Sequence, residues 1–150
     1  MATVRPAEPA DLPTIAVLAG EFRAHWGRAE PSAQAIERGV GRLQEDPDAE
    51  FLLAAPACGF ALLRFRFSLW TDSPECELED LYVRGAERGA GLGRALVELS
   101  LDRARERGCR RMDIVANEAN APALALYRSL GFSAWFDPPG GHNLILRRVL

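Results

Sequence analysis

Lysine is missing altogether from this 150-residue chain, and histidine and cysteine are scarce. A phosphate-binding loop of the Walker type is therefore excluded, because that motif needs a lysine beside its glycines. The two histidines and three cysteines stand far apart and form no CxxC pair, so neither a zinc centre nor a disulfide framework is expected. We predict no metal, and the dispersed thiols favour a reducing compartment, the cytoplasm.

Long apolar runs and a large excess of one charge sign are also absent. No stretch of 18 apolar residues occurs, so no membrane span is expected, and Pro6, Glu8 and Pro9 interrupt any signal peptide. The net charge is only −3 and the arginines are spread along the chain, so we expect no nucleic-acid partner. With 48% hydrophobic and 26% charged residues and no internal repeat, the composition indicates one globular domain over residues 1–150.

Hydrophobic periodicity and turn residues predict an α/β fold in the order β-α-α-β-β-β-α-β-α-β-β. We expect a mixed central sheet of six or seven strands, flanked by about four helices. The expected helices run from Asp11 to Gly27, from Pro31 to just before the loop Asp46-Pro-Asp48, from Leu92 to Arg107 and from Asn120 to Gly131. The expected strands are Thr3–Arg5, Phe51–Ala55, Gly59–Leu69, Glu75–Val83, Met112–Ala116, Phe132–Phe136 and Asn143–Val149.

A glycine-rich loop, Arg88-Gly-Ala-Gly-Leu-Gly-Arg94, joins the strand that ends at Val83 to the next helix. Glycines let the backbone approach a ligand closely, and the amides at a helix start favour an anion such as pyrophosphate. Arg88 and Arg94 would add charge-assisted hydrogen bonds. The glycine spacing differs from the dinucleotide fingerprint GxGxxG, and on these residues alone a flexible turn is the alternative interpretation.

A second motif, Asn117-Glu-Ala-Asn-Ala-Pro-Ala-Leu-Ala-Leu-Tyr-Arg-Ser-Leu-Gly-Phe132, follows one strand later. Together with the loop and with Leu78-Glu-Asp-Leu-Tyr-Val83 before it, this motif resembles the GCN5-related N-acetyltransferase (GNAT) superfamily. That family pairs an R/Q-x-x-G-x-G/A loop with a later N-x-x-A-x-x-L-Y-x-x-L-G-F helix. Gly59-Phe-Ala61, Trp70 and Glu79-Asp80 look most like its diamine (spermidine/spermine) acetyltransferase branch, and the resemblance covers nearly the whole chain.

The resemblance implies acetyl-coenzyme A as the acetyl donor. Its pyrophosphate would meet the glycine loop, and its pantetheine arm would pair with the strand before the loop in the manner of an added strand. Many relatives have proline where this chain has Gly85, a departure that touches no implied contact. The residues implied to contact the cofactor are Leu81, Tyr82, Val83, Arg88, Gly89, Ala90, Gly91, Leu92, Gly93, Arg94, Asn120 and Tyr127.

Acetyl transfer to an amine needs a base for the amine proton, an N–H donor for the carbonyl oxygen, and an acid for the departing thiolate. The resemblance assigns the acid to Tyr127, for which simple packing within its helix is the alternative interpretation. The backbone of Leu81 or Tyr82 is the expected N–H donor.

Glu75, Glu77 and Glu79 alternate along one strand and so share one of its faces. Clustered carboxylates attract a cation, and Glu79 is the expected base, directly or through water. For Glu75 and Glu77 a solvated strand face is the alternative. Asp80 points the other way unless a β-bulge intervenes, which makes it the lesser candidate.

We therefore expect direct transfer of the acetyl group to a primary amine of a small cationic acceptor: a diamine or polyamine, a basic amino acid or an aminosugar. In this family the segment Phe22–Pro31 usually forms one wall of the acceptor pocket, so His25 and Trp26 join Glu79 and Asp80 as expected substrate contacts. Acetylation of a protein N-terminal or side-chain amine is one alternative, and a non-catalytic module that senses acyl-coenzyme A is another. Relatives are often homodimers, and we expect one here.

Overall fold

A computed structural model describes residues 2–150, and the chain divides into two compact units. The first unit ends at Ile114 and the second comprises Val115–Leu150. The single domain over residues 1–150 stays a prediction. No helix in the described part of the chain is long and apolar enough to cross a membrane.

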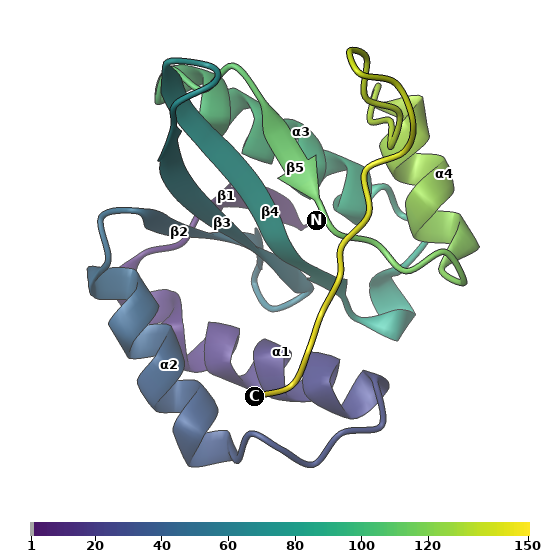
Figure 1. Cartoon of the computed structure of the whole chain (residues 1–150). Helices are drawn as coiled ribbons and strands as arrows, with labels where there is room; N and C mark the ends of the chain where they lie inside the picture. The colour runs from purple at the N-terminus through teal and green to yellow at the C-terminus, as the bar shows by residue number, and fades with distance from the viewer. Residues whose placement is uncertain (1) are drawn as a thin grey trace. The chain divides into compact units, whose positions relative to one another are not determined.

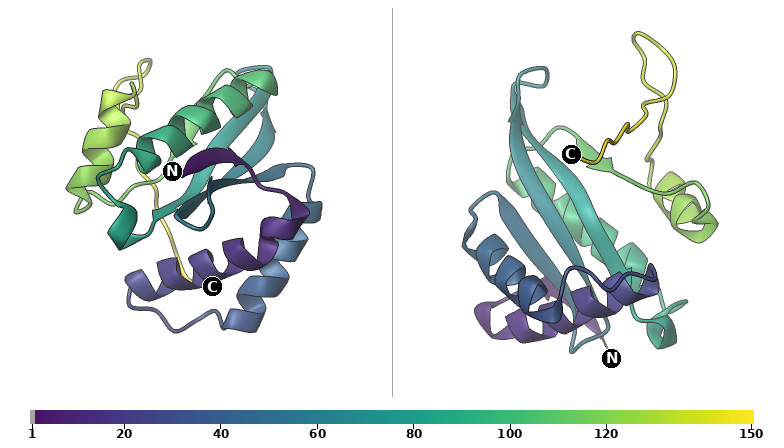
Figure 2. Two further views of the ribbon diagram at one scale, coloured as in Figure 1. Left: turned by 180° about the vertical axis from the view of Figure 1, so that it is seen from behind. Right: turned by 60° about the horizontal axis from the view of Figure 1, so that its bottom comes forward.

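The first unit is built on a mixed sheet in which the described residues form five strands in the order β1-β2-β3-β4-β5 (Figure 1). Strands β1 to β4 pair antiparallel, whereas β5 joins β4 in parallel. The strands are β1 (Thr3–Pro6), β2 (Ala49–Ala55), β3 (Gly59–Ser68), β4 (Ser73–Val83) and β5 (Met112–Ile114). Helices α1 (Leu12–His25) and α2 (Ala33–Glu45) cover one face, and α3 (Leu92–Glu106) covers the other (Figure 2). Short 3-10 helices, η1 (Pro9–Asp11) and η2 (Gly85–Glu87), precede α1 and α3.

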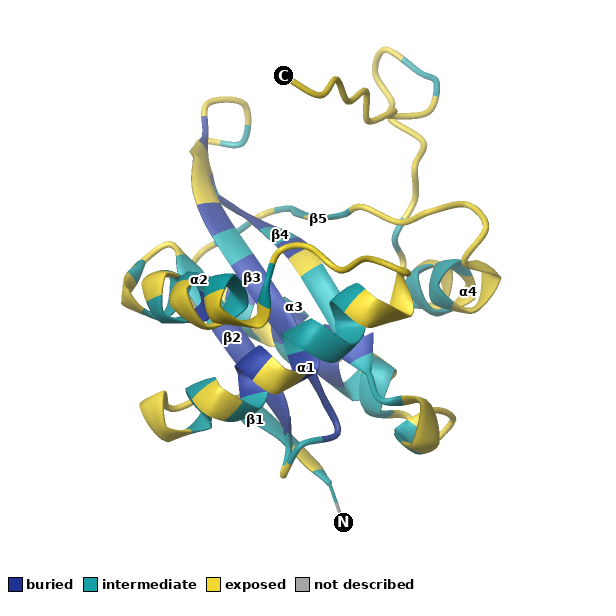
Figure 3. Cartoon of the chain, turned by 90° about the horizontal axis from the view of Figure 1, so that it is seen from below, coloured by how far each residue is buried: buried dark blue, intermediate teal, exposed yellow. Residues whose placement is uncertain are grey.

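From Phe51 to Ala55, strand β2 is continuously apolar, because both of its faces are covered. Phe51 and Leu53 belong to a core cluster with Ile15 of α1 and Val40 of α2. Leu52 alternates to the opposite face, which α3 covers. Figure 3 shows the buried residues gathered along β2, β3 and β4 and on the inner side of α1. The buried sheet thus fixes the position of the end of β4, where the candidate site lies.

The second unit contains one helix in its described residues, α4 (Ala121–Ser129). The predicted strands Phe132–Phe136 and Asn143–Val149 are wrong, because the only strand-like pairing in this unit is an isolated bridge between Trp135 and His142. Between the two segments stand two prolines that have no N–H and two glycines with φ of +94° and +101°, which tighten the turn without extending a ladder. Apolar side chains of the last segment stay exposed, Leu146 at 89%. The mixed α/β architecture is confirmed, with five strands rather than six or seven.

Gly59 lies where the beginning of β3 meets the end of β4, opposite Val83. A Cβ atom at this position would collide with the carbonyl oxygen of Tyr82 and lie 3.1 Å from the Cα of Val83, so a side chain forces the two strands apart. We expect Gly59→Ala to lower the free energy of unfolding by about 1–3 kcal/mol, measured by urea denaturation. Gly39→Ala in α2 is the matched control: its Cβ meets open space, and alanine favours a helix, so stability should hold or rise. Equal stabilities for the two variants would contradict the close approach.

Candidate active site

A β-bulge in β4 sets the direction of its acidic side chains. Leu62 of β3 pairs with Asp80 and the next residue, Leu63, pairs with Leu78, so Glu79 is the extra residue. A bulge shifts the side-chain alternation by one position. Asp80 therefore lies on the same face as its partner Leu62, which belongs to the core beneath α1 and α2. The sequence placed Asp80 on the opposite face from Glu79 unless a β-bulge intervened, and the structure contains that bulge.

Asp80 is a largely desolvated carboxyl. Burial, joined by repulsion from the carboxylates of Glu79 and Glu77, raises the pKa of Asp80 to about 6, and the opposing attraction of Arg64 is smaller. A carboxyl of this kind changes its protonation near neutral pH, as a general base must.

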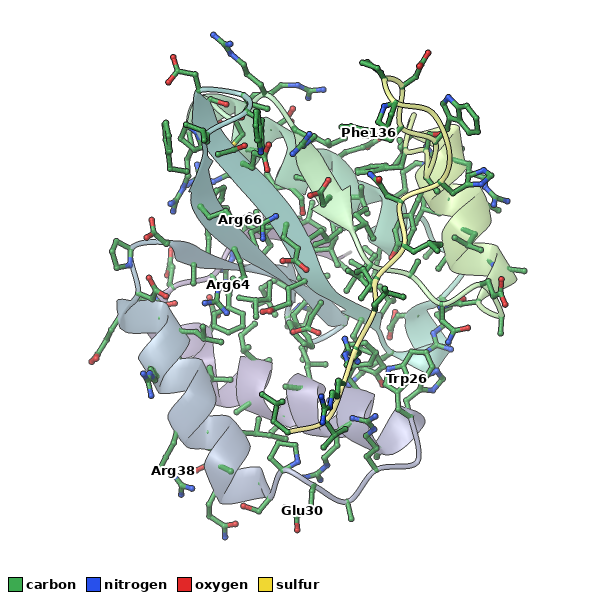
Figure 4. All side chains as sticks on the ribbon, viewed as in Figure 1. Trp26, Glu30, Arg38, Arg64, Arg66 and Phe136 are labelled. Carbon is green, nitrogen blue, oxygen red and sulfur yellow. The ribbon has the colours of Figure 1, made fainter. Side chains whose placement is uncertain are left out.

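Glu79 has a different environment from its neighbour. Its side chain is 40% exposed, and its Oε2 lies 3.3 Å from Nη1 of Arg64 on β3. The other terminal nitrogen of Arg64 lies 3.7 Å from Asp46, directly after α2. Figure 4 shows Arg64 on β3, beside the end of α2. The charge of Glu79 is thus partly neutralised in place.

Glu75, at the beginning of β4, is a buried, ion-paired side chain and does not face solvent. Its side chain is only 4% exposed, and its Oε1 lies 2.7 Å from Nη2 of Arg111. The hydroxyl of Thr71 donates a further hydrogen bond to the same oxygen. The interpretation of Glu75 as a solvated residue is therefore wrong.

An aromatic cluster stands beside the end of β4. The ring of Phe22 on α1 stacks on Tyr82 with centroids 5.3 Å apart, and His25 and Trp26 continue the cluster. Trp26, at the end of α1 in Figure 4, is 51% exposed and so presents part of its ring to solvent. The expected substrate residues His25 and Trp26 thus lie next to the strand that carries Glu79 and Asp80. Such rings can bind a cation over their faces.

A bidentate ion pair fixes α1 against the end of β4. Arg84, the first residue after the strand, donates from Nε and Nη2 to the two carboxylate oxygens of Glu21 at 2.9 and 2.7 Å. The hydrogen bonds from Arg84 hold the pKa of Glu21 below its usual range. Glu21, Arg84 and Arg64 were not foreseen as site residues, because their contacts depend on which strands and helices become neighbours.

The last part of β4 offers an open backbone edge. Strand β5 pairs only with Cys76–Leu78, while β4 runs on to Val83. Within residues 2–114, the stretch from Glu79 to Val83 therefore has no strand beside it on the β5 side. Backbone N–H and C=O groups at such an edge accept an extended ligand in the way that they accept another strand.

The glycine loop follows directly and leads into α3. Gly89 and Gly91 have φ of +83° and +81°, a conformation that glycine adopts without strain, and Gly91 is the N-cap of the helix. Arg88 donates from Nε to the carbonyl of Val83 at 2.9 Å, which folds the loop back onto β4. The first amides of α3, from Leu92 on, have no acceptor within the helix. A Cβ at either loop glycine would meet open space, so the backbone is accessible to a phosphate group.

In the second unit, the ends of α4 determine how Tyr127 is held. Asn120 caps the helix by accepting a hydrogen bond from the amide of Ala123 at 3.4 Å. At the other end Gly131, with φ of +90°, and Phe132 donate to Arg128 and Tyr127 in a Schellman motif. The rings of Tyr127 and Phe132 then meet edge to face at 6.1 Å. Burial raises the pKa of Tyr127, so its hydroxyl keeps its proton at neutral pH, as a general acid requires.

In the described chain no group of three or more histidine, cysteine, aspartate or glutamate side chains is placed to hold a metal ion. The sheet order, the open edge of β4 and the glycine loop agree with an acyltransferase. The model of the acetyltransferase (GNAT) family matches residues 16–132, and the chain belongs to that family. Acetyltransferases of this family use acetyl-coenzyme A.

The curated relatives carry the names of different acceptors. The chain is 36% identical to streptothricin acetyltransferase of Streptomyces lavendulae over 93 residues, which are 59% of this chain and 47% of that protein. It is 33% identical to mycothiol acetyltransferase of Beutenbergia cavernae over 122 residues, 79% of this chain and 40% of that protein. The chain thus spans about half or less of the length of these curated relatives.

Among solved structures, a chain from Arthrobacter sp. FB24, described as a candidate acetyltransferase, superposes with a TM-score of 0.88. The two chains are 32% identical, and the match covers 100% of this chain and 97% of the other.

Proposed function

We propose that this chain is an N-acetyltransferase that transfers the acetyl group of acetyl-coenzyme A directly to a primary amine of a small cationic acceptor. One observation carries the proposal: Glu79 and Asp80 precede Tyr82 on the last part of β4, and the Tyr82 ring packs against Phe22 and His25 of α1. Carboxylates attract an ammonium group, and aromatic faces complement its charge. A diamine or polyamine, a basic amino acid and an aminosugar all meet this description.

The residues present fit the cofactor that the family uses. Backbone amides from Gly89 to Arg94, with two glycines at positive φ, would hold the pyrophosphate, and the edge of β4 from Leu81 to Val83 would pair with the pantetheine arm. Asn120 and Tyr127 complete the proposed contacts. When bound, acetyl-coenzyme A supplies an electrophilic thioester carbonyl.

The chain's own groups then serve three needs. A carboxylate of the Glu79–Asp80 pair accepts the proton of the ammonium group and leaves a neutral amine. The backbone N–H of Leu81 or Tyr82 donates to the carbonyl oxygen as negative charge develops on it. Tyr127, whose pKa burial raises, donates its proton to the thiolate.

We also propose that the chain belongs to the diamine acetyltransferase branch, that it forms a homodimer and that it is located in the cytoplasm. A protein amine as acceptor and a non-catalytic module that senses acyl-coenzyme A are the competing functions. The carboxyls of Glu79 and Asp80 support a cationic acceptor, and because one of them can serve as the base they favour catalysis over sensing.

The acceptor class is tested with amines of equal chain length and different charge. We expect kcat/KM for a diamine to exceed that for the neutral monoamine by about tenfold to a hundredfold, because hydrogen bonds to charged groups contribute about 1.5–3 kcal/mol. The matching amino acid, whose far end is a carboxylate, should be the poorest of the three. Coenzyme A release, followed with a thiol reagent, measures all three rates. A preference for the carboxylate-bearing amine would contradict the cationic acceptor.

A further inference from the structure

We propose that Asp80 is the catalytic residue that takes the proton from the acceptor amine, and that Glu79, held by Arg64, is its charged neighbour rather than the base. This inference rests on the acetyl transfer proposed above and assigns one of its steps to a single side chain. The sequence alone favoured Glu79, because strict alternation placed Asp80 on the other face of β4.

Geometry separates the two carboxyls. The bulge at Glu79 places Asp80 opposite Leu62, so Asp80 lies on the same face of the sheet as Tyr82, whose ring stacks on Phe22. Glu79 lies toward solvent and pairs with Arg64 at 3.3 Å. Glu79 is thus engaged by a guanidinium, whereas Asp80 lies on the face that α1 and α2 cover.

Charges around Asp80 come from four elements. On its own strand the neighbours are Glu77 and Glu79, which repel its negative form, and β3 contributes Arg64, which attracts it. After α2, Asp46 is bound to Arg64 and so shares that positive charge.

On α1 the ionisable groups near this end of β4 are Glu21, which is bonded to Arg84, and His25, whose ring lies 6.5 Å from that of Tyr82. Burial is the first cause that raises the pKa of Asp80 to about 6. It follows that removing the charge of Glu79 should lower this pKa and that removing Arg64 should raise it.

The proton balance of the step is complete within the chain and its substrates. The ammonium group gives one proton to Asp80, which later releases it to water. The neutral nitrogen forms the C–N bond as the C–S bond breaks. Tyr127 gives its proton to the thiolate and regains one from the acetylated nitrogen.

The first test is the pH dependence of kcat/KM for a diamine, which reports the base of the free enzyme. Wild type should show an acidic limb near the pKa of about 6. Asp80→Asn should lose about 10²- to 10⁴-fold in kcat/KM together with the limb. Glu79→Gln should keep the limb and move it to lower pH, whereas Arg64→Gln should move it to higher pH. Asp113→Asn on β5 is the matched control and should leave the limb in place.

The opposite pattern overturns the proposal: a limb that disappears in Glu79→Gln and persists in Asp80→Asn assigns the base to Glu79. If wild type acetylates no amine at all, the proposed function fails first, and the titration of Asp80 is then tested by stability alone.

Stability provides that second readout. The folded chain binds the proton of Asp80 more tightly than the unfolded chain, because burial raises the pKa of Asp80 to about 6 from an ordinary value of 3.8. This contribution to stability is present at acidic pH and is lost as the pH rises through about 6. Asp80→Asn loses no proton, so its Tm should exceed that of wild type above pH 7, and the gap should close toward pH 4. Should this variant not fold, the carboxyl carbon of Asp80 in wild type is titrated by NMR. A midpoint below pH 5 in that titration would overturn the proposal, whereas one near 6 supports it.

Discussion

Tyr127→Phe should lower kcat by about 10²- to 10⁴-fold while the affinity for coenzyme A stays near that of wild type. The substitution deletes one hydroxyl and keeps the ring that meets Phe132 at 6.1 Å, so the Schellman end of α4 is preserved. Without the hydroxyl, the thiolate must depart without a positioned acid. Steady-state rates with a diamine measure kcat, and titration calorimetry measures the affinity.

Phe132→Leu is the matched control, because it removes the ring that Tyr127 contacts and keeps the hydroxyl. If packing is the role of Tyr127, Phe132→Leu should impair turnover at least as much as Tyr127→Phe. A Tyr127→Phe enzyme with the wild-type rate of the chemical step, measured in a single turnover, would remove this residue from catalysis.

Gly91→Val should weaken coenzyme A binding by at least tenfold, about 1.4 kcal/mol, with the sheet intact. Gly91 is the N-cap of α3 at φ of +81°, and the branched side chain would stand where the pyrophosphate is proposed to meet the backbone. Valine also strains that conformation, so circular dichroism must show that the variant is folded. Calorimetry then measures the dissociation constant.

Gly85→Ala is the control for this loop. Its Cβ meets open space, its φ lies outside the left-handed region, and no contact to the cofactor is proposed for it. Its affinity should match wild type. A folded Gly91→Val protein with unchanged affinity would place the pyrophosphate elsewhere.

Local signals made parts of this chain predictable. The helix expected from Leu92 to Arg107 is observed as Leu92–Glu106. It was predictable because the glycine before it and its apolar stripe are both local features of the sequence. The Schellman end of α4 is equally local, since Gly131 and Phe132 follow Tyr127 within five residues. The family's two motifs consist of such local features, which is why a resemblance based on them held.

Non-local pairing decided what the sequence could not show. Arg64 contacts Glu79 from the neighbouring strand, and the orientation of Asp80 depends on the register shift between Leu62 and Leu63. Neither feature has a signal in the adjacent sequence. The last two predicted strands failed for a related reason. Apolar alternation indicates a strand only where a neighbouring strand supplies a ladder of hydrogen bonds. Asn143–Val149 forms no strand among the described residues, and Asn143 bonds to Ala134 beside an isolated bridge.

The central claim is that this chain transfers an acetyl group to an amine, and coenzyme A release by the wild-type chain tests it most directly. With acetyl-coenzyme A held at saturation, thiol release should rise with diamine concentration to a plateau, and the N-acetylated diamine should appear in equal amount by mass spectrometry. Tight binding of acetyl-coenzyme A with no release above the amine-free rate, for any amine in the panel, would contradict the claim and identify the chain as a module that only senses the acyl thioester.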